Sequence, residues 1–301
     1  MKRYRDLNSY LKEKFKVKIY KIALDAGFSC PNKDGLLSSK GCIFCSEGSA
    51  AVYIDKSLSI ADQISNRIRI LKKKDQDAKF IAYFQAFSNT YAPLFTLEKV
   101  YKESLAHEDV VGLSLGTRPD CIDKAKLDLI AQFSEKKEEL WIEYGLQSMH
   151  EKTLKLINRG HSLEDFKAAV KMTQARGIKI CAHMILGLPQ ESKADMLNTA
   201  KFIADLNIEG IKIHLLHVIK DTLLEQMYLK KEVSMLSQKE YVQLVCDILE
   251  ILPPEMIIHR LTGEADKKIH IAPLWALNKG RVLKDINDEL VRRDSYQGRK
   301  I

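Results

Sequence analysis

Short apolar runs rich in valine, isoleucine and tyrosine recur along the chain and predict six β-strands. These runs lie at residues 17–24, 79–87, 109–115, 139–145, 178–186 and 211–218. Several are apolar over most of their length, as strands buried on both faces must be. The segments between them have helical periodicity, and two begin with a serine followed three residues later by an aspartate, at Ser59 and Ser162. The second of these predicted helices ends at Gly177, a typical helix stop.

The alternation of strand and helix, repeated about six times, predicts an α/β fold with parallel strands joined by right-handed crossovers. The pattern fits either a doubly wound sheet or a curved, barrel-like sheet. In both folds, ligands gather at the carboxyl ends of the strands. Two prolines at 253–254 predict a boundary between a core over residues 1–252 and a C-terminal extension over residues 253–301, which includes a basic helix near 279–293.

Composition places the chain among ordinary globular proteins. It has 301 residues, of which 46% are hydrophobic, and it contains neither a secretory signal nor an apolar stretch long enough to span a membrane. We therefore expect a soluble cytoplasmic protein. The 48 Lys and Arg residues exceed the 40 Asp and Glu residues and give a formal charge of +8, which favours an anionic partner. The basic end of the chain, residues 292–301, is either part of that surface or a disordered, solvated tail.

Three of the six cysteines fall in one glycine-rich polar stretch, residues 27–49, which directly follows the first predicted strand. They are Cys30, Cys42 and Cys45. Because the stretch leaves the carboxyl end of a strand, we expect it at the functional rim of the fold. In a reducing compartment, cysteines are more often metal ligands or catalysts than disulfide partners.

Four kinds of site are compatible with these cysteines. A structural zinc site needs four ligands, yet no histidine precedes His107 and the other cysteines lie far away in sequence. A deaminase-type zinc site needs an upstream His-x-Glu, which is missing. A redox pair of Cys42 and Cys45 would leave Cys30 without a role. An iron–sulfur cluster held by three thiolates leaves one iron open for chemistry, and the count of three favours this last kind.

Motifs over nearly the whole chain resemble the radical S-adenosylmethionine (radical SAM) superfamily. Most members space their cysteines as C-x3-C-x2-C, whereas this chain has C-x11-C-x2-C, a wider gap that resembles the branch related to the elongator catalytic subunit. Within that branch the chain resembles the YtqA/YhcC family. The motifs that carry this resemblance are LDAGFSCPNKDG, GCIFC, FSNTYAP, GTRPDC, EYGLQSMHEKTLKLINRGH and APLWALNKG. The resemblance implies a partial (β/α)6 barrel, similar to a TIM barrel, with a C-terminal extension.

The resemblance also implies the cofactors. A 4Fe–4S cluster would be held by Cys30, Cys42 and Cys45, and SAM would chelate the fourth iron. Reductive cleavage of SAM would then supply a radical that abstracts hydrogen from the substrate, with an electron donor such as flavodoxin or ferredoxin. Phe44 is expected beside the adenine of SAM; the alternative is an aromatic side chain packed under the rim.

Further SAM contacts are implied at the ends of the second and third strands. Ser88, Asn89 and Thr90 stand where the superfamily usually carries a GGE-like motif, which this chain lacks. Arg118 or Asp120, after the third strand, would reach SAM or substrate. Alternatively, these two residues pair with each other and cap the next helix.

The fourth and fifth strands supply the remaining implied contacts. Glu143, Gln147 and Ser148 lie along or just past the fourth strand, and Arg159 follows twelve residues after Gln147, an arrangement that resembles the SAM-binding Gln and Arg of the coproporphyrinogen dehydrogenase branch. A guanidinium suits a carboxylate through bidentate hydrogen bonds. Gly187, in a Gly-Leu-Pro turn, would approach the adenine by its backbone, or would form an ordinary strand-to-helix turn.

Catalytic residues on the substrate side are not identified by the sequence; only weak candidates exist. His214 and His217 fall in the sixth predicted strand, where alternation would point only one of them inward. A lone histidine is more often structural, so Lys220, just past the strand, is the better candidate for an anionic group of the substrate. The remaining cysteines are expected to be buried or incidental thiols: Cys121, Cys181 and Cys246.

The resemblance implies that the substrate is tRNA, bound at its anticodon region. The implied reaction converts 5-carboxymethylaminomethyluridine or its 2-thio form at the wobble position to the 5-aminomethyl form. The basic surplus favours the same partner. Two alternatives stay open: a radical SAM dehydrogenase or decarboxylase that acts on a small acidic metabolite, and a zinc-stabilised RNA-binding protein without catalysis.

Overall fold

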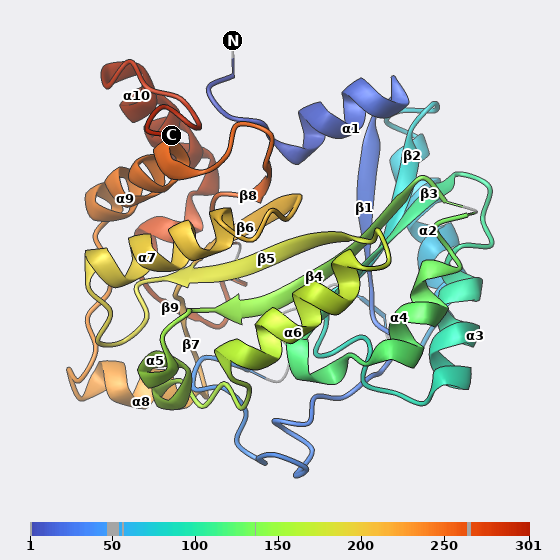
Figure 1. Ribbon diagram of the computed structural model, residues 1–301, viewed down its shortest axis with the longest axis horizontal. Coiled ribbons are helices and arrows are strands. Elements are labelled where there is room, and N and C mark those ends of the chain that lie inside the picture. The colour runs from blue at the N-terminus through green and yellow to red at the C-terminus, as the bar shows by residue number, and fades with distance from the viewer. Residues whose placement is uncertain (1, 47–53, 56, 136, 264–265) are drawn as a thin grey trace.

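Seven parallel strands form one curled sheet, a half-barrel with helices on its outer side (Figure 1). The computed structural model describes residues 2–46, 54–55, 57–135, 137–263 and 266–301. Along the sheet, the strands are β1 Ile19–Leu24, β2 Lys79–Phe84, β3 Val110–Thr117, β4 Glu139–Gln147, β5 Lys179–Leu186, β6 Gly210–Leu215 and β8 Ile257–Arg260. The predicted α/β fold with six parallel strands is confirmed. The seventh strand, β8, comes from the segment that was predicted as an extension.

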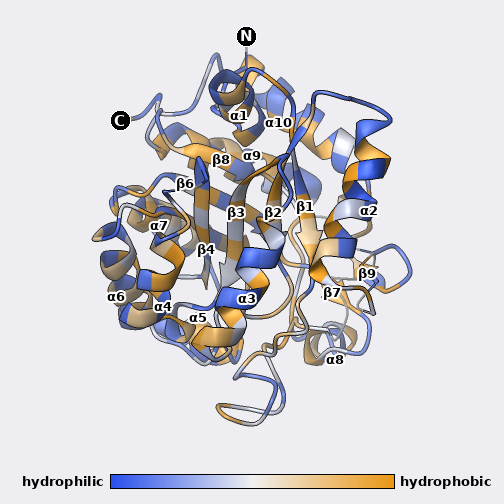
Figure 2. Ribbon diagram, turned by 90° about the vertical axis from the view of Figure 1, so that its right-hand side faces the viewer, coloured by the Kyte–Doolittle hydropathy of each residue, from blue (hydrophilic) through white to orange (hydrophobic). Residues whose placement is uncertain are grey.

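Helices connect successive strands and cover the outer face of the sheet. They are α2 Ile60–Lys72, α3 Leu94–Ser104, α4 Lys124–Ala131, α5 Glu151–Leu156, α6 Leu163–Gln174, α7 Lys193–Ala204 and α9 Gln238–Ile251. The two predicted serine caps are present, since Ser59 accepts from the Asp62 N–H and Ser162 forms a full capping box with Asp165. The helices alternate hydrophobic and hydrophilic residues (Figure 2), as helices with one face on a sheet must.

The amino ends of the strands are covered by α1 Leu7–Phe15. Leu7 and Tyr10 of this helix pack against Trp141 at the start of β4. The Tyr10 hydroxyl donates to buried Glu139 at 2.8 Å, and Lys179 at the start of β5 donates to the same carboxylate. Because α1 covers the amino ends of the strands, the open side of the half-barrel lies at their carboxyl ends. The cysteine stretch emerges on that side (Figure 1).

The C-terminal part completes the molecule. After β6 the chain forms a small antiparallel pair, β7 Val218–Ile219 with β9 His270–Ala272, and the helix α8 Leu223–Leu229. It ends with α10 Lys279–Arg292, which packs against α9. Two 3-10 turns are also present, η1 Pro119–Cys121 and η2 Leu274–Leu277. No helix among the described residues combines the length and hydropathy that a membrane span requires.

The basic end of the chain is folded onto the body. Gln297 is buried and donates to the carbonyls of Pro253 and Met256, and the tail also contacts the N-terminal segment through Arg5. Most of its cations are paired with carboxylates of α9 and α10: Arg292 and Arg293 with Glu289, Arg293 with Asp247, and Lys300 with Glu250. The alternative of a disordered tail is therefore wrong, and few of these charges are free for a partner.

Candidate functional site

A cavity of about 350 Å³ opens at the carboxyl ends of the strands. It brings together residues that are far apart in sequence, from the cysteine stretch to the loop after β8. Among the predicted site residues, the cavity is lined by Cys30, Cys42, Phe44, Cys45, Arg118, Glu143, Gln147, Arg159, His214 and His217. The location is the one expected for a parallel α/β fold.

The cysteine stretch is held by backbone hydrogen bonds to distant elements. The Ile43 N–H donates to the Ile157 carbonyl, and the Leu224 N–H at the start of α8 donates to the Ile43 carbonyl. The Ile43 side chain is buried in a small apolar core with Ile157 and Leu224, and Phe44 packs against that core. The polar side of the loop, which carries the cysteines, is thereby turned toward the cavity.

The donor set fits an iron–sulfur cluster. Burial raises the pKa of Cys45 to about 11, and the nearby Cys42 sulfur adds to the shift, so the Cys45 thiol ionises readily only with a strong Lewis acid as partner. Asn32 and Arg159 each place an N–H donor 3.6 Å from the Cys42 sulfur, which is where hydrogen bonds to a cluster thiolate act. The sulfurs of Cys30, Cys42 and Cys45 do not all lie within 4.8 Å of one another. Thiolates on one zinc ion would be roughly 4 Å apart, so the spacing favours a larger unit.

Two arginines are fixed beside the cysteines. The Arg159 guanidinium donates twice to the Gly145 carbonyl, at 3.2 and 2.6 Å. Arg118 donates to the Arg159 carbonyl at 2.7 Å and forms a bidentate pair with Asp120 at 2.9 and 2.7 Å. The pairing of Arg118 with Asp120 confirms one half of the alternative expectation from the sequence, whereas the cap of the next helix, α4, is supplied by Asp123. Because Arg118 also lines the cavity, pairing does not remove it from the site.

Glycines make room for these arginines. A Cβ atom at Gly145 would lie 2.6 Å from an Arg159 nitrogen and 2.7 Å from the Gln147 amide nitrogen. At Gly160, which has a φ of +75°, it would lie 2.8 Å from the Asn32 amide oxygen. Gln147 itself has a φ of 76° and sits at a β-bulge at the end of β4. Bulges are frequent next to active sites because they redirect a side chain.

Seven of the residues predicted from the sequence lie outside the cavity lining, Asp120 among them. Ser88 and Thr90 are fully buried and bond to the Thr117 hydroxyl at 2.9 and 2.7 Å, and Asn89 donates to the Gly116 carbonyl. They fix the loop after β2 to the end of β3, and the residues that line the cavity there are Gln85, Ala86 and Phe87. Gly187 lies against Leu236, and Lys220 is exposed on the antiparallel pair. Ser148, also named above, donates to Glu191.

Glu143 lies at the centre of a buried ion-pair cluster at the floor of the cavity. One carboxylate oxygen accepts from Lys21 and from the Ser114 hydroxyl at 2.6 Å, and the other accepts from Lys212 and from His183 at 2.8 Å. Burial alone would raise the pKa of Glu143, but Lys21 and Lys212 outweigh it and hold its pKa well below the usual range. A carboxylate with both oxygens occupied in this way organises the floor of the site.

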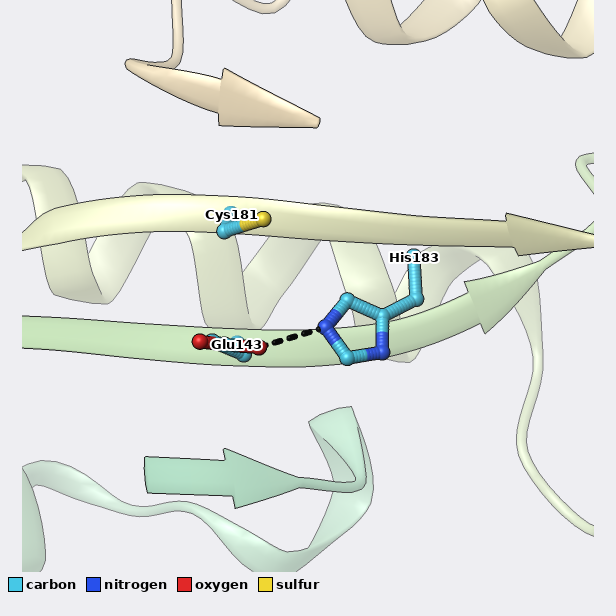
Figure 3. Close-up of side chains that lie close together, drawn as sticks. All are labelled: Glu143, Cys181 and His183. Carbon is cyan, nitrogen blue, oxygen red and sulfur yellow. Dashed lines mark hydrogen bonds and ion pairs between the residues drawn. The ribbon is translucent and has the colours of Figure 1, made fainter. Parts of the chain in front are cut away.

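Glu143, Cys181 and His183 approach one another closely, with ligand atoms within 4.8 Å (Figure 3). This group is unsuited to a metal ion, because the His183 Nε2 and the Cys181 sulfur both carry protons where a metal would need lone pairs. His183 uses its Nε2–H to donate to Glu143, and burial followed by Lys212 lowers the pKa of His183 to about 4. Burial also raises the pKa of the Cys181 thiol. With two lysines on the carboxylate, this group is a proton-bearing ion-pair cluster.

The expectation that only one of His214 and His217 points inward is wrong. Strand β6 ends at Leu215, so the alternation of a strand does not extend to His217, and both imidazoles line the cavity. His214 packs beside His183, with ring centroids 5.2 Å apart. Sequence reasoning also missed Arg260 and Gly263, which enter through the unpredicted strand β8 and the loop that follows it.

The sequence is similar to proteins of a known superfamily. Residues 38–203 match the model of the radical SAM superfamily, and residues 208–292 match that of the Radical_SAM C-terminal domain. YtqA of Bacillus subtilis (strain 168) is 46% identical over 302 residues, which cover 99% of this chain and 92% of YtqA. YhcC of Escherichia coli (strain K12) is 33% identical over 288 residues, which cover 96% of this chain and 92% of YhcC.

Similarity to elongator-type proteins is more distant. The tRNA uridine(34) acetyltransferase of Dehalococcoides mccartyi (strain CBDB1) is 26% identical over 181 residues, which cover 59% of this chain and 38% of that protein. The structure of an N-terminally truncated archaeal Elp3 from Methanocaldococcus infernus has a TM-score of 0.68 at 18% identity, over 93% of this chain and 64% of that chain, and thus shares its fold. From these matches, the chain belongs to the radical SAM superfamily and is a radical SAM enzyme of the YtqA/YhcC family, whose cofactors are a 4Fe–4S cluster and S-adenosylmethionine.

Proposed function

We propose that this enzyme modifies the wobble uridine of tRNA and converts the 5-carboxymethylaminomethyl group, on uridine or 2-thiouridine, to a 5-aminomethyl group. The observation that carries the proposal is the similarity, over 181 residues, to a protein named for its action on uridine 34 of tRNA. The fold shared with the archaeal Elp3 supports the same class of substrate.

In this proposal Cys30, Cys42 and Cys45 hold the cluster. When bound, the cluster and SAM supply a radical that abstracts a hydrogen atom from the substrate. Arg159 is held by two hydrogen bonds to the Gly145 carbonyl, so its remaining nitrogen is aimed at Cys42 with little freedom to move. A fixed donor at a cluster sulfur tunes the reduction potential of the cluster.

Three cavity residues complete the proposed SAM pocket. Phe44 offers an aromatic face from the cysteine loop, and Gln147 offers an amide from the bulge at the end of β4. Arg118 offers a guanidinium that is oriented by its bidentate pair with Asp120. These side chains are held by the scaffold in advance, which limits the conformational entropy lost on binding.

The segments next to cavity residues Ile219 and Asp266 offer cations for the phosphate backbone of tRNA. Lys220 follows β7 directly, and its backbone is bonded to the Ile269 carbonyl. Lys267 and Lys268 directly follow Asp266, which lines the cavity. All three lysines are exposed, and within the described part of the chain none forms an ion pair. They are better placed than the paired cations of the tail for contacts whose strength falls with salt.

The test combines iron analysis with tRNA chemistry. Anaerobically purified protein should contain about four irons per chain and cleave SAM when reduced. In cells that lack the gene, mass spectrometry of tRNA nucleosides should show that the 5-carboxymethylaminomethyl form accumulates at the expense of the 5-aminomethyl form. The native gene should restore the pattern and a Cys42→Ser variant should not. Unchanged wobble uridines in the deletion strain would refute the tRNA assignment and favour an acidic metabolite as the substrate.

A further inference from the structure

The ends of β5, β6 and β8 contribute a group of side chains to the cavity that the proposed cofactor chemistry does not use. We call it the histidine wall: His183, His214, His217, Arg260 and the adjacent Gly263. Two of its imidazoles carry a buried nitrogen that has no hydrogen-bond partner among the described residues, Nε2 of His214 and Nε2 of His217. A buried polar atom without a partner is costly, so it points to a ligand that supplies the missing partner.

The proton on His217 is fixed by a neighbour. His270 bonds to the Pro273 carbonyl through Nε2 at 2.9 Å, and because a carbonyl only accepts, His270 is the donor there. In neutral His270 the Nδ1 is then an acceptor, and it faces Nδ1 of His217 at 3.3 Å. His217 therefore carries its proton on Nδ1, and its Nε2 presents a lone pair.

Gly263 keeps the space in front of these rings open. A Cβ atom at this position would lie 3.4 Å from Nε2 of His217 and 3.6 Å from Nδ1 of His214. Any side chain would therefore fill the space that both imidazoles face. The space is suited to a group with N–H donors, because a hydrogen-bond acceptor would meet the lone pair of His217.

Arg260 adds a positive charge to the same wall. Its guanidinium lines the cavity, and within the described residues it makes no hydrogen bond or ion pair. Below it, Lys21 and Lys212 are paired with Glu143, and Asp266 also lines the cavity, so that together with Arg260 three positive charges face two negative ones. This end of the cavity thus has an excess of positive charge and an unused planar donor, which suits a carboxylate.

We infer that the histidine wall binds a secondary amine that carries a carboxylate, that is, an N-alkylated amino acid group. Arg260 takes the carboxylate and Nε2 of His217 accepts from the amine. A simple anion would leave the imidazole acceptor unsatisfied, and a simple amine would face Arg260 without a counter-charge. The identification of this group with the 5-carboxymethylaminomethyl substituent rests on the proposed function. The aminomethyl product lacks the carboxylate and would leave Arg260 without its partner, which favours product release.

The experiment measures binding to anaerobic, unreduced holoenzyme in the presence of SAM. The probes are the nucleosides 5-carboxymethylaminomethyluridine and 5-aminomethyluridine, which differ only in the carboxymethyl group. Wild-type enzyme should bind the first about tenfold or more tightly than the second, because a charge-assisted bidentate pair is lost. Arg260→Gln should remove this preference. Arg67→Gln, an exposed change on α2, is the matched control and should keep it.

A second variant tests the amine contact. His217→Ala should weaken binding of both amine-bearing nucleosides several-fold and leave binding of 5-carboxymethyluridine, which has no amine, unchanged. His217→Gln keeps an acceptor and should restore part of the affinity. Equal weakening of all three nucleosides would indicate a merely structural role and would overturn the amine assignment.

Further binding measurements distinguish a site for an N-alkylated amino acid group from a site for SAM. Equal affinity of wild-type enzyme for the first two nucleosides would overturn it. SAM also ends in an amino acid, so an equal loss of SAM affinity in Arg260→Gln would assign the site to the cofactor and overturn it as well. N-methylglycine should compete for the site in wild-type enzyme and not in Arg260→Gln. If that competition is found while wobble uridines are unchanged in the deletion strain, the tRNA assignment fails and the site assignment stands.

Discussion

The cavity has two walls that are built in different ways. The cysteine wall consists of Cys30, Cys42, Cys45, Arg118 and Arg159, and most of it belongs to one loop and to the arginines packed on it. The residues of the histidine wall come instead from three strand ends that are up to 80 residues apart in sequence. The first wall has a compact sequence motif and the second has none.

The two walls also differ in how their polar atoms are satisfied. On the cysteine wall both arginines have protein partners, and the sulfurs are the groups that lack a strong one. On the histidine wall the open groups are imidazole nitrogens and one guanidinium. The difference teaches that the cofactor side is organised around soft ligands for a metal cluster, whereas the substrate side is organised around hydrogen bonds and charge. The predictions below test that division.

The largest effect is expected from removing a sulfur. Cys42→Ser should lower the iron content from about four per chain to well below one and reduce SAM cleavage to background, since a hydroxyl is a poor iron ligand. His217→Ala should keep its iron, because the three cysteine ligands are unchanged in that variant. Iron and sulfide analysis of anaerobic protein, with electron paramagnetic resonance after reduction, makes the comparison. Iron loss in both variants would contradict the division into two walls.

The next effect is on stability, at the ion-pair cluster below the histidine wall. Glu143→Ala leaves the buried Lys212 and the half-buried Lys21 without their counter-charge and should lower the free energy of unfolding by about 3–5 kcal/mol. The matched control is Glu164→Ala, which removes an exposed pair with Lys167 and should cost less than about 1 kcal/mol. Urea unfolding of both variants measures the difference. Similar costs for the two would show that the cluster is solvated and not a buried support.

Acid should destabilise the protein through its buried imidazoles. Burial, and then His270, lowers the pKa of His217 to about 4, while a histidine in the unfolded chain titrates at about 6.5. Between these values the unfolded chain binds more protons than the native one, so the stability falls as the pH drops from 6.5 toward 4, by up to about 1.4 kcal/mol per pH unit for each such group.

Two variants separate the contributions of individual buried histidines to this loss of stability in acid. His217→Leu should flatten the profile above pH 4. Next to the cysteine wall, His161 bonds to the Gly145 carbonyl that Arg159 also contacts, and burial followed by Arg159 lowers the pKa of His161 to about 3. His161→Leu should therefore flatten a profile that extends to lower pH. Urea unfolding at several pH values in the anaerobic chamber provides the measurement. Unaltered slopes in both variants would mean that neither imidazole is buried in its neutral form.

The smallest expected effect concerns the charges outside the cavity. Replacing Lys220, Lys267 and Lys268 together by glutamine should flatten the dependence of log tRNA affinity on log salt by about 2, if each lysine meets one phosphate. Replacing Arg292 and Lys300, which are paired with carboxylates, should change the slope by less than about 1. Filter binding at several salt concentrations tests both. The opposite ranking would place the RNA on the tail.

Much of the fold could be predicted from the chain. The six apolar runs set the parallel sheet, because a strand buried on both faces needs apolar residues throughout. The seventh strand was missed because β8 has only four residues, Ile257–Arg260, after two prolines, too short a run to carry a periodic signal. The sixth strand was predicted to run to residue 218, but β6 ends at Leu215. The apolar pattern continues without a break into β7, which belongs to another sheet.

The cysteine wall follows from the sequence because its ligands are close together in one loop, and their type and number limit the chemistry. The histidine wall does not, since an isolated His or Arg has no local pattern that separates a structural role from a binding role. What the sequence determined by itself is the sheet, the cysteine loop and the family that they define. Only the tertiary structure decided which cations are free and which carboxylates and imidazoles are buried, because pairing and desolvation depend on neighbours that are distant along the chain.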